Sequence, residues 1–387
     1  MGRVRDCLWS LFRRDGASPA SRRSDNTAIQ RPPVSKRISA GKHNSEHSQC
    51  TVFEMPLPYG DYEAYNNTSR QYINTGAAHI FKTFPSDALM PLEDEGIGRL
   101  KAFYEAWFPK NGSMSRDRVD GIYTLAFVNS SRCEDTISCG ATSVSRSLRK
   151  HYVQCMYAGT GVRRGCGIVG DSQCTGIELW IKGSLPVTGP WIQSMYVPPD
   201  ERLNKLCLIA APKPNYMPCI NTGTSFVEMP DLVAGPTHSV FELDSDVYIY
   251  ICRLSPCSSI AYTAAAAAKR TSEPPMYECP RLHRAATSPC HEHTVRRRRR
   301  HRSPKLGTTR SVFIHVYSDI TKDGHTRTGG ARLLLPGSIH LANGDAVHLK
   351  KVTPGADINI KSTGFDRAQF ILIDMPGYQD DDDVRSI

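Results

Sequence analysis

Cysteine and histidine are the residues of this chain best suited to chemistry, and each occurs 13 times. Both can ligate zinc, and a thiolate can act as a nucleophile. One cluster has suitable residue types, but its spacing fits no closed four-ligand zinc pattern: Cys279, His283, Cys290, His291 and His293. No local motif marks a cysteine as a nucleophile beside a histidine base. The sequence therefore predicts no catalytic residue, no cofactor-binding residue and no metal ligand.

A run of arginines is the strongest sign of a binding function. It consists of Arg296, Arg297, Arg298, Arg299, Arg300 and Arg302. Such a run is typical of a nuclear import signal, or of an arm that binds nucleic acid non-specifically through its phosphates. No aromatic residue interrupts the run, so it contains no platform on which a base could stack. We expect an import receptor as its partner and keep nucleic acid as the alternative.

The segments around this run do not have the composition of a folded core. Residues 261–310 contain a polyalanine stretch and several prolines, which predicts a long disordered insertion. Residues 1–48 are rich in Ser, Arg, Asn and Pro and have no apolar period, so we expect a disordered basic tail. Residues 379–387 form an acidic tail.

Composition and length limit the class of protein. The 387 residues suffice for two domains, and the formal net charge of +10 suits nucleic acid, anionic lipid or nuclear import. The number of cysteines is odd, and the N-terminal segment has too few apolar residues for the core of a signal peptide. We therefore expect reduced cysteines in an intracellular protein. No stretch approaches the roughly 20 apolar residues that span a bilayer, so we expect no transmembrane segment.

The rest of the chain has the pattern of strands and turns. Residues 333–376 contain short apolar runs bounded by Gly, Pro, Asn or Asp, which predicts consecutive strands. Residues 179–212 repeat part of this pattern, with Gly183-Ser184-Leu185 matching Gly337-Ser338-Ile339. One exception is residues 97–108, whose apolar spacing predicts an inserted helix.

Earlier segments extend the repeat in the same order. Residues 121–128 match 246–252, and residues 152–157 match 312–317. We therefore predict a tandem duplication, with all-β domains at 49–214 and 215–378 and the disordered insertion inside the second domain.

The order of these segments resembles the dUTPase fold, as it is fused in tandem in herpesvirus dUTPases and dUTPase-related proteins. Gly364-Phe-Asp-Arg-Ala-Gln-Phe-Ile-Leu372 is similar to the last motif of that family, and Pro199–Leu208 is similar to its counterpart in the first copy. The resemblance covers about residues 50–378. It implies two tandem dUTPase-like β-barrels.

The resemblance also implies where catalytic groups would stand, and most of them are missing. Hydrolysis of dUTP requires Mg²⁺ on the triphosphate, a carboxylate that orients water, and cationic cover for the phosphates. The first motif lacks its acid, the second lacks its arginine, the third lacks its Asp and Tyr, and the Gly-rich closing segment is absent. The degenerate motif positions are Gly223, Ser225, Ser318, Asp319, Gly337, Asp366, Arg367 and Gln369.

The resemblance therefore implies a non-enzymatic viral dUTPase-related protein, a pseudoenzyme that acts through contacts with host or viral proteins. We expect it in the host nucleus and cytoplasm or in the virion tegument, regulating viral gene expression or host innate signalling, with no cofactor. Two alternatives remain open. A divergent dUTP diphosphatase would convert dUTP to dUMP and pyrophosphate with Mg²⁺, using acids such as Asp319 or Asp345. A jelly-roll ligand of the tumour-necrosis-factor type would be exported and trimeric, and strand connectivity distinguishes its fold from the dUTPase fold.

Overall fold

The computed structural model describes twelve segments: residues 57–66, 70–75, 78–84, 96–130, 132–139, 141–168, 173–183, 189–213, 227–234, 240–265, 309–317 and 330–377. Residues 1–33 and 34–387 are separate units, and every described residue belongs to the second. The two expected tails, and the expected domain boundaries near residues 48, 214 and 378, lie outside the described residues.

Eight consecutive strands in the first half form a jelly roll, here called the first roll. They are β4 (Leu100–Phe108), β5 (Ser113–Val119), β6 (Ile122–Ser130), β7 (Arg132–Cys139), β8 (Thr142–Arg149), β9 (Tyr152–Tyr157), β10 (Val162–Ile168) and β11 (Cys174–Lys182). Strands β4, β11, β6 and β9 are neighbours in one sheet, whereas β5, β10, β7 and β8 form another. This order of strands in two facing sheets is that of an eight-stranded jelly roll.

The second half repeats this order strand for strand and forms the second roll. Its strands are β17 (Tyr248–Leu254), β18 (Ser259–Thr263), β19 (Arg310–Tyr317), β20 (Arg332–Leu335), β21 (Ile339–Ala342), β22 (Ala346–Val352), β23 (Asp357–Ser362) and β24 (Ala368–Pro376). Here β17, β24, β19 and β22 are neighbours in one sheet, and β18, β23, β20 and β21 form the other. Strands β4 to β11 therefore correspond in order to β17 to β24.

The two rolls exchange strands. Strand β1 (Asp61–Tyr65) precedes the first roll in sequence but pairs with β22 of the second, while β12 (Trp191–Tyr196) precedes the second roll but pairs with β9 of the first. Because β9 and β22 are counterparts, the exchange is reciprocal. The remaining short elements extend the sheets or form turns: β2 (Gln71–Asn74), β3 (His79–Lys82), η2 (Pro199–Arg202), β13 (Cys207–Pro212), β14 (Val227–Glu228), β15 (Leu232–Val233), β16 (Phe241–Leu243) and η3 (Pro336–Ser338).

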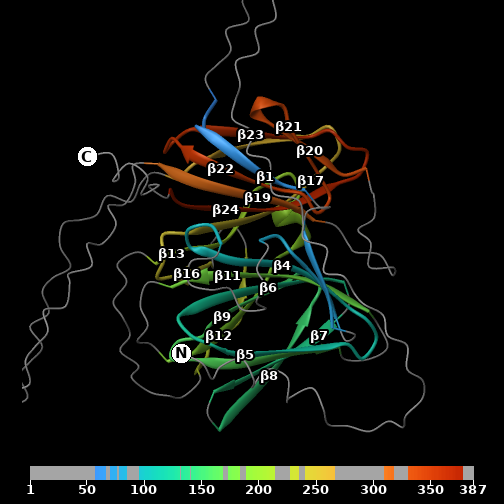
Figure 1. Ribbon diagram of the computed structural model, residues 1–387, viewed down its shortest axis with the longest axis vertical. Coiled ribbons are helices and arrows are strands. Elements are labelled where there is room, and N and C mark those ends of the chain that lie inside the picture. Colours follow the sequence, from blue (N-terminus) through green and yellow to red (C-terminus); the bar gives the residue numbers. More distant parts are fainter. Residues whose placement is uncertain are drawn as a thin grey trace, which may run out of the picture. The chain divides into compact units, whose positions relative to one another are not determined.

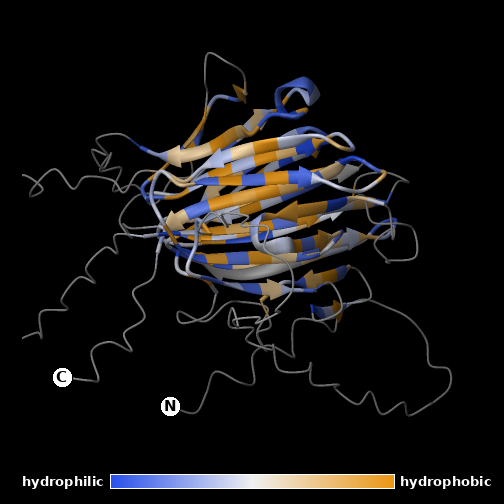
Figure 2. Ribbon diagram, turned by 90° about the horizontal axis from the view of Figure 1, so that it is seen from above, coloured by the Kyte–Doolittle hydropathy of each residue, from blue (hydrophilic) through white to orange (hydrophobic). Residues whose placement is uncertain are grey.

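The sheets stack in four layers with three apolar cores between them (Figure 1). One core fills the space between the two sheets of each roll, which we call its lumen, and the third lies between the larger sheets of the two rolls. Successive side chains of a strand face opposite sides, so in β6 Leu125 faces the inter-roll core and Ala126 faces the first lumen. Figure 2 shows hydrophobic and hydrophilic residues alternating along the strands.

The prediction of an all-β fold is confirmed, but several details were wrong. The predicted helix at 97–108 is strand β4, whose apolar residues line two cores at once, with Phe103 on the inter-roll side and Tyr104 in the lumen. The expected dUTPase-like barrels are not closed in the described part of the chain, because each roll consists of two separate sheets.

The register of the predicted repeat was also wrong. Residues 121–128 belong to β6, whose counterpart is β19 rather than the strand at 246–252. Both described ends of the predicted insertion are part of the second roll, since Tyr262 is buried in β18 and Arg310 is buried at the start of β19.

Candidate functional site

The described motif positions do not come together. Gly337 lies in the η3 turn that follows β20, with a φ of 73° that favours glycine. Asp366 lies at the other end of β20, where its carboxylate accepts a hydrogen bond of 2.9 Å from the Gly330 N–H. Arg367 follows it, and Gln369 pairs with β19 in the sheet. The structure therefore assembles no nucleotide site from these residues.

Half of the motif positions, and the whole arginine run, lie outside the described residues. Gly223, Ser225, Ser318 and Asp319 lie outside the described residues, as do all six arginines of the run. Asp345, the acid considered for a divergent diphosphatase, accepts a hydrogen bond of 2.9 Å from the Ala342 N–H and so stabilises the turn between β21 and β22.

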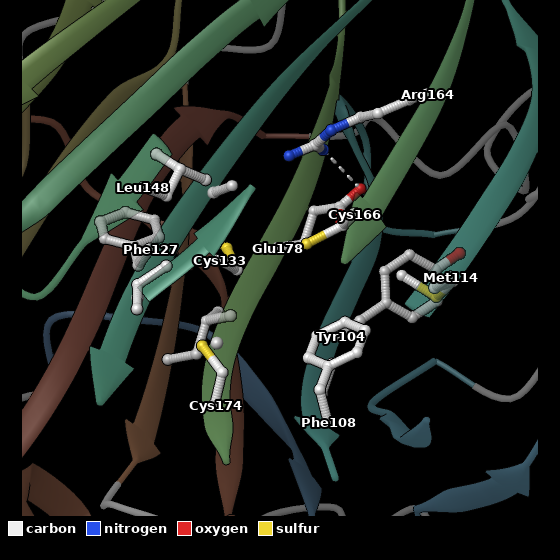
Figure 3. Close-up of a pocket in the computed structure, with 15 residues that line it drawn as sticks. Tyr104, Phe108, Met114, Phe127, Cys133, Leu148, Arg164, Cys166, Cys174 and Glu178 are labelled. Carbon is white, nitrogen blue, oxygen red and sulfur yellow. Dashed lines mark ion pairs between the residues drawn. The ribbon is translucent and has the colours of Figure 1, made fainter. Parts of the chain in front are cut away.

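A cavity of about 30 Å³ lies in the lumen of the first roll (Figure 3). Three free thiols line it, from three different strands: Cys133 on β7, Cys166 on β10 and Cys174 on β11. The hydrogen bond to Cys133 and burial raise the pKa of Cys166. The hydrogen bond to Cys166 lowers the pKa of Cys133, but the one to Cys174 and burial more than offset this, so the net shift is also upward. Both thiols therefore keep their protons at neutral pH.

A buried ion-pair network borders the same cavity. The Arg164 Nε donates to both Asp135 oxygens at 2.8 and 2.9 Å, and the Arg164 Nη1 lies 3.1 Å from the Glu178 Oε1. Burial opposes the charge of Arg164, but the two carboxylates outweigh it and raise the pKa of the guanidinium. The Trp180 indole N–H donates to the Glu178 Oε1. Both acids are thus occupied by an arginine.

The side chains around this cavity are not arranged as a metal centre. The two nearby carboxylates, Asp135 and Glu178, face Arg164. No histidine lines the cavity. Across the described segments, no group of three or more His, Cys, Asp or Glu side chains is arranged to hold a metal ion.

A second buried arginine lies in the lumen of the second roll. The Arg310 Nε donates to the Asp374 Oδ1 at 2.7 Å, and the Arg310 Nη1 donates to the Asp246 Oδ2 at 2.7 Å. Tyr262 donates its hydroxyl proton to the other Asp374 oxygen. Burial raises the pKa of Asp374, although Arg310 and the hydrogen bonds act in the opposite direction.

Asp374 also contacts the chain on both sides of the segment 266–308, which contains the arginine run. The N–H of Ala265, the last described residue before the segment 266–308, donates to the Asp374 Oδ2 at 2.7 Å. On the other side, the Thr309 carbonyl accepts a hydrogen bond of 2.9 Å from the Gly377 N–H, and Arg310 pairs with Asp374. We call Asp374, Arg310, Tyr262 and Ala265 the stem clamp.

Sequence reasoning did not find the stem clamp, although a signal was present. Arg310 precedes the apolar run Ser311–Tyr317, and Asp374 interrupts the run Phe370–Met375. A charge inside an apolar strand is costly unless it is paired, so these two residues could have been matched as partners.

A third ionic cluster joins the two rolls. The Arg70 Nη1 lies 2.6 Å from the Glu105 Oε2, and the His315 Nε2 lies 2.7 Å from the Glu105 Oε1. Burial alone would raise the pKa of Glu105, but Arg70 and His315 lower it to about 2. Burial lowers the pKa of His315. This cluster fixes the contact between β4 and β19 and does not border the cavity.

None of the described segments forms a helix long and apolar enough to cross a membrane.

Comparison with known proteins gives a match at the level of the fold. No protein-family model and no curated protein matches the chain. Among solved structures, YhhW from Escherichia coli aligns at a TM-score of 0.50 and 14% identity, over 82% of this chain and 99% of that chain. The structure of the bacterial pirin YhhW in complex with nickel(II) aligns equally well, at a TM-score of 0.50 and 14% identity, over 82% of this chain and 100% of that chain. At this identity the likeness shows a shared cupin-like, jelly-roll β fold and nothing about activity.

Proposed function

We propose that the chain is a non-enzymatic scaffold that acts through protein contacts and presents the segment 266–308 to its partners. The observation that carries this proposal is the stem clamp, because Asp374 binds residues on both sides of that segment. The segment contains the arginine run, whose sequence is typical of a nuclear import signal. The scaffold would thus carry a basic element that an acidic import receptor can recognise.

The way in which the buried charges are used supports the same proposal. Asp135 and Glu178 pair with Arg164, Asp374 pairs with Arg310, and Glu105 pairs with Arg70. A general acid or base needs access to a substrate proton, and these carboxylates are instead enclosed in ion pairs. A role in regulating viral gene expression or host innate signalling, in the nucleus, the cytoplasm or the tegument, is the part of this proposal that rests on the sequence resemblance to dUTPase-related proteins alone, since both rolls have the strand order of a jelly roll.

Localisation and partner capture with an alanine variant test this function. In the variant, Arg296 to Arg300 are replaced by alanine in the full chain. The matched control replaces Arg3, Arg5, Arg13 and Arg14, which removes a similar positive charge from the other basic stretch. We expect loss of nuclear accumulation and of the captured import receptor only in the first variant. Unchanged nuclear accumulation of that variant would rule the proposal out.

The strand connectivity favours one alternative as a second candidate. Both rolls have the strand order of a jelly roll, which is the fold of an exported ligand of the tumour-necrosis-factor type. That candidate requires secretion and a trimer. Light scattering of the purified chain distinguishes the two, since a monomer removes the ligand hypothesis and a stable trimer favours it.

A further inference from the structure

The turn between β23 and β24 holds an aromatic ring in solvent. The Phe365 side chain is 94% exposed, more than any other large apolar side chain in the described segments. The backbone around it is tightly fixed. The Thr363 N–H donates to the Arg332 carbonyl at 3.0 Å, the Gly330 N–H donates to Asp366 at 2.9 Å, and a Cβ on Gly364 would lie 1.6 Å from the Gly330 oxygen. The turn that carries the ring is therefore joined by hydrogen bonds to residues 330 and 332.

Three exposed cations lie in this turn and on the outer face of the strands that adjoin it. Arg332, Lys361 and Arg367 are all exposed. Lys361 and Thr363 are two residues apart and so face the same side of the sheet, and Arg332 lies opposite Thr363 on the neighbouring strand β20. The one acid in the turn, Asp366, is engaged with the Gly330 N–H. We call Phe365, Arg332, Lys361 and Arg367 the turn surface.

We infer that the turn surface binds single-stranded nucleic acid. A base can stack on the Phe365 ring, and stacking on an aromatic side chain requires no particular sequence. The phosphates on either side of that base can contact Arg332, Lys361 and Arg367. The arginine run contains no aromatic residue, so the turn surface would supply the stacking site that the run lacks.

Two other partners fit the turn surface less well. A membrane anchor normally inserts several apolar side chains, but the exposed neighbours of Phe365 are Thr363, Asp366 and Arg367. An acidic peptide would need an apolar groove beside the ring, whereas the adjoining outer-face residues Arg332 and Lys361 are charged. A single ring is a complete stacking site for one base.

Fluorescence anisotropy with a short fluorescein-labelled oligothymidylate tests this inference. The parent protein is the full chain with Arg296 to Arg300 changed to alanine, so that the run does not dominate binding. In this background, Phe365→Ala should weaken binding about tenfold. Arg332→Ala combined with Lys361→Ala should weaken it and lower the slope of log affinity against log salt by about 1.4, at 0.7 per phosphate contact on a single strand. Because these side chains are exposed, the substitutions should leave the fold intact, which circular dichroism verifies.

Matched controls separate the turn surface from general charge and exposed apolar surface. Val233→Ala removes the next most exposed large apolar side chain, and Lys150→Ala removes a cation at a turn of the first roll. Both should bind as the parent does. Equal binding by Phe365→Ala and the parent would overturn the inference. So would Phe365-dependent binding to polyglutamate or to phosphatidylserine vesicles with none to the oligonucleotide. Because the arginine run is neutralised throughout, the result is independent of the proposed import function.

Discussion

The two rolls share one frame but use their buried charges differently. Each has an arginine between two acids, Arg164 in the first roll and Arg310 in the second. In each roll, an acid on the last strand lies opposite a tyrosine on the first strand in the backbone register. Glu178 lies opposite Tyr104, and Asp374 lies opposite Tyr248. The first arginine borders the cavity. The second belongs to the stem clamp, so the same kind of ion pair borders a cavity in one roll and joins the two flanks of the segment 266–308 in the other.

The two lumens also differ in the side chains that fill them. The residue beside Glu178 on strand β6 is Ala126, which lines the cavity, while the residue beside Asp374 on the counterpart strand β19 is Val312, which is fully buried. The second lumen is lined mainly by aliphatic side chains, whereas the first contains the cavity, which three thiols line. The same jelly-roll frame therefore accommodates different side chains in its two lumens.

The largest expected effect comes from removing the arginine of either lumen. Arg310→Met leaves Asp374 and Asp246 without their cation, and Arg164→Met does the same to Asp135 and Glu178. Breaking a buried pair in this way typically costs about 3–5 kcal/mol. Urea unfolding of both variants measures this cost. Limited proteolysis should show faster cleavage within 266–308 in the Arg310 variant only, and equal cleavage in both variants would contradict the role of the stem clamp.

A smaller effect is a loss of stability in acid that originates in the second roll. Burial lowers the pKa of His348 to about 3, well below the ordinary value near 6.5. The folded protein therefore keeps His348 neutral while the unfolded chain takes up a proton, so stability is full above about pH 6.5 and falls as the pH drops toward 3. Between pH 7 and pH 5 the loss should be roughly 2 kcal/mol.

His348→Val isolates this effect, because the register places Val153 at the counterpart position of the first roll. Thermal unfolding as a function of pH should be flatter for the variant. His315 contributes in the same direction, since burial also lowers its pKa. A variant with the same acid sensitivity as the native chain would show that His348 is not the cause.

Exchanging the residues at the counterpart positions Ala126 and Val312 tests the difference between the lumens. Val312→Ala opens a cavity in a filled core and should cost about 2 kcal/mol. Ala126→Val fills part of an existing cavity and should raise stability by up to about 1 kcal/mol. Urea midpoints measure both. Equal costs at the two positions would mean that the first lumen is as tightly packed as the second.

The sequence predicted the class of fold better than its connections. Turn residues such as Gly337, Gly344 and Gly355 have positive φ values, so the boundaries between strands were visible as turn signals. The helix at 97–108 was a false prediction because both faces of β4 are buried and its apolar residues then fit either period. The exchange of β1 and β12 could not be read from the sequence, because each of these strands pairs with an edge strand of the other roll.

The site was less predictable than the fold for a related reason. The stem clamp joins Asp374 to Ala265 and Arg310, which are 109 and 64 residues away in sequence. The repeat was aligned in the wrong register because short apolar runs match any strand of the same length. Asp366 and Arg367 were singled out only as degenerate motif positions, and the structure shows that they follow the exposed ring of Phe365 in the turn between β23 and β24.

The smallest expected effect concerns the exchanged strand β1. The Lys350 Nζ lies 3.3 Å from the Glu63 Oε2, and both side chains are about a third exposed. Exposed pairs of this kind contribute about 0–1 kcal/mol, so Glu63→Gln should lower stability by less than about 0.5 kcal/mol. Urea unfolding can detect a larger loss, which would show that this pair, and not the sheet pairing with β22, holds β1 in place.

Turnover of dUTP by the purified full chain is the most direct test of a scaffold against a catalyst. The protein is incubated with dUTP and Mg²⁺, and pyrophosphate release is followed beside an equal amount of the Arg164→Met variant. We expect no release above background from either protein, because the buried carboxylates of Glu105, Asp135, Glu178 and Asp374 are enclosed in ion pairs and the described motif positions lie apart. Release of dUMP and pyrophosphate at ordinary enzymatic rates by the native chain would contradict the scaffold function.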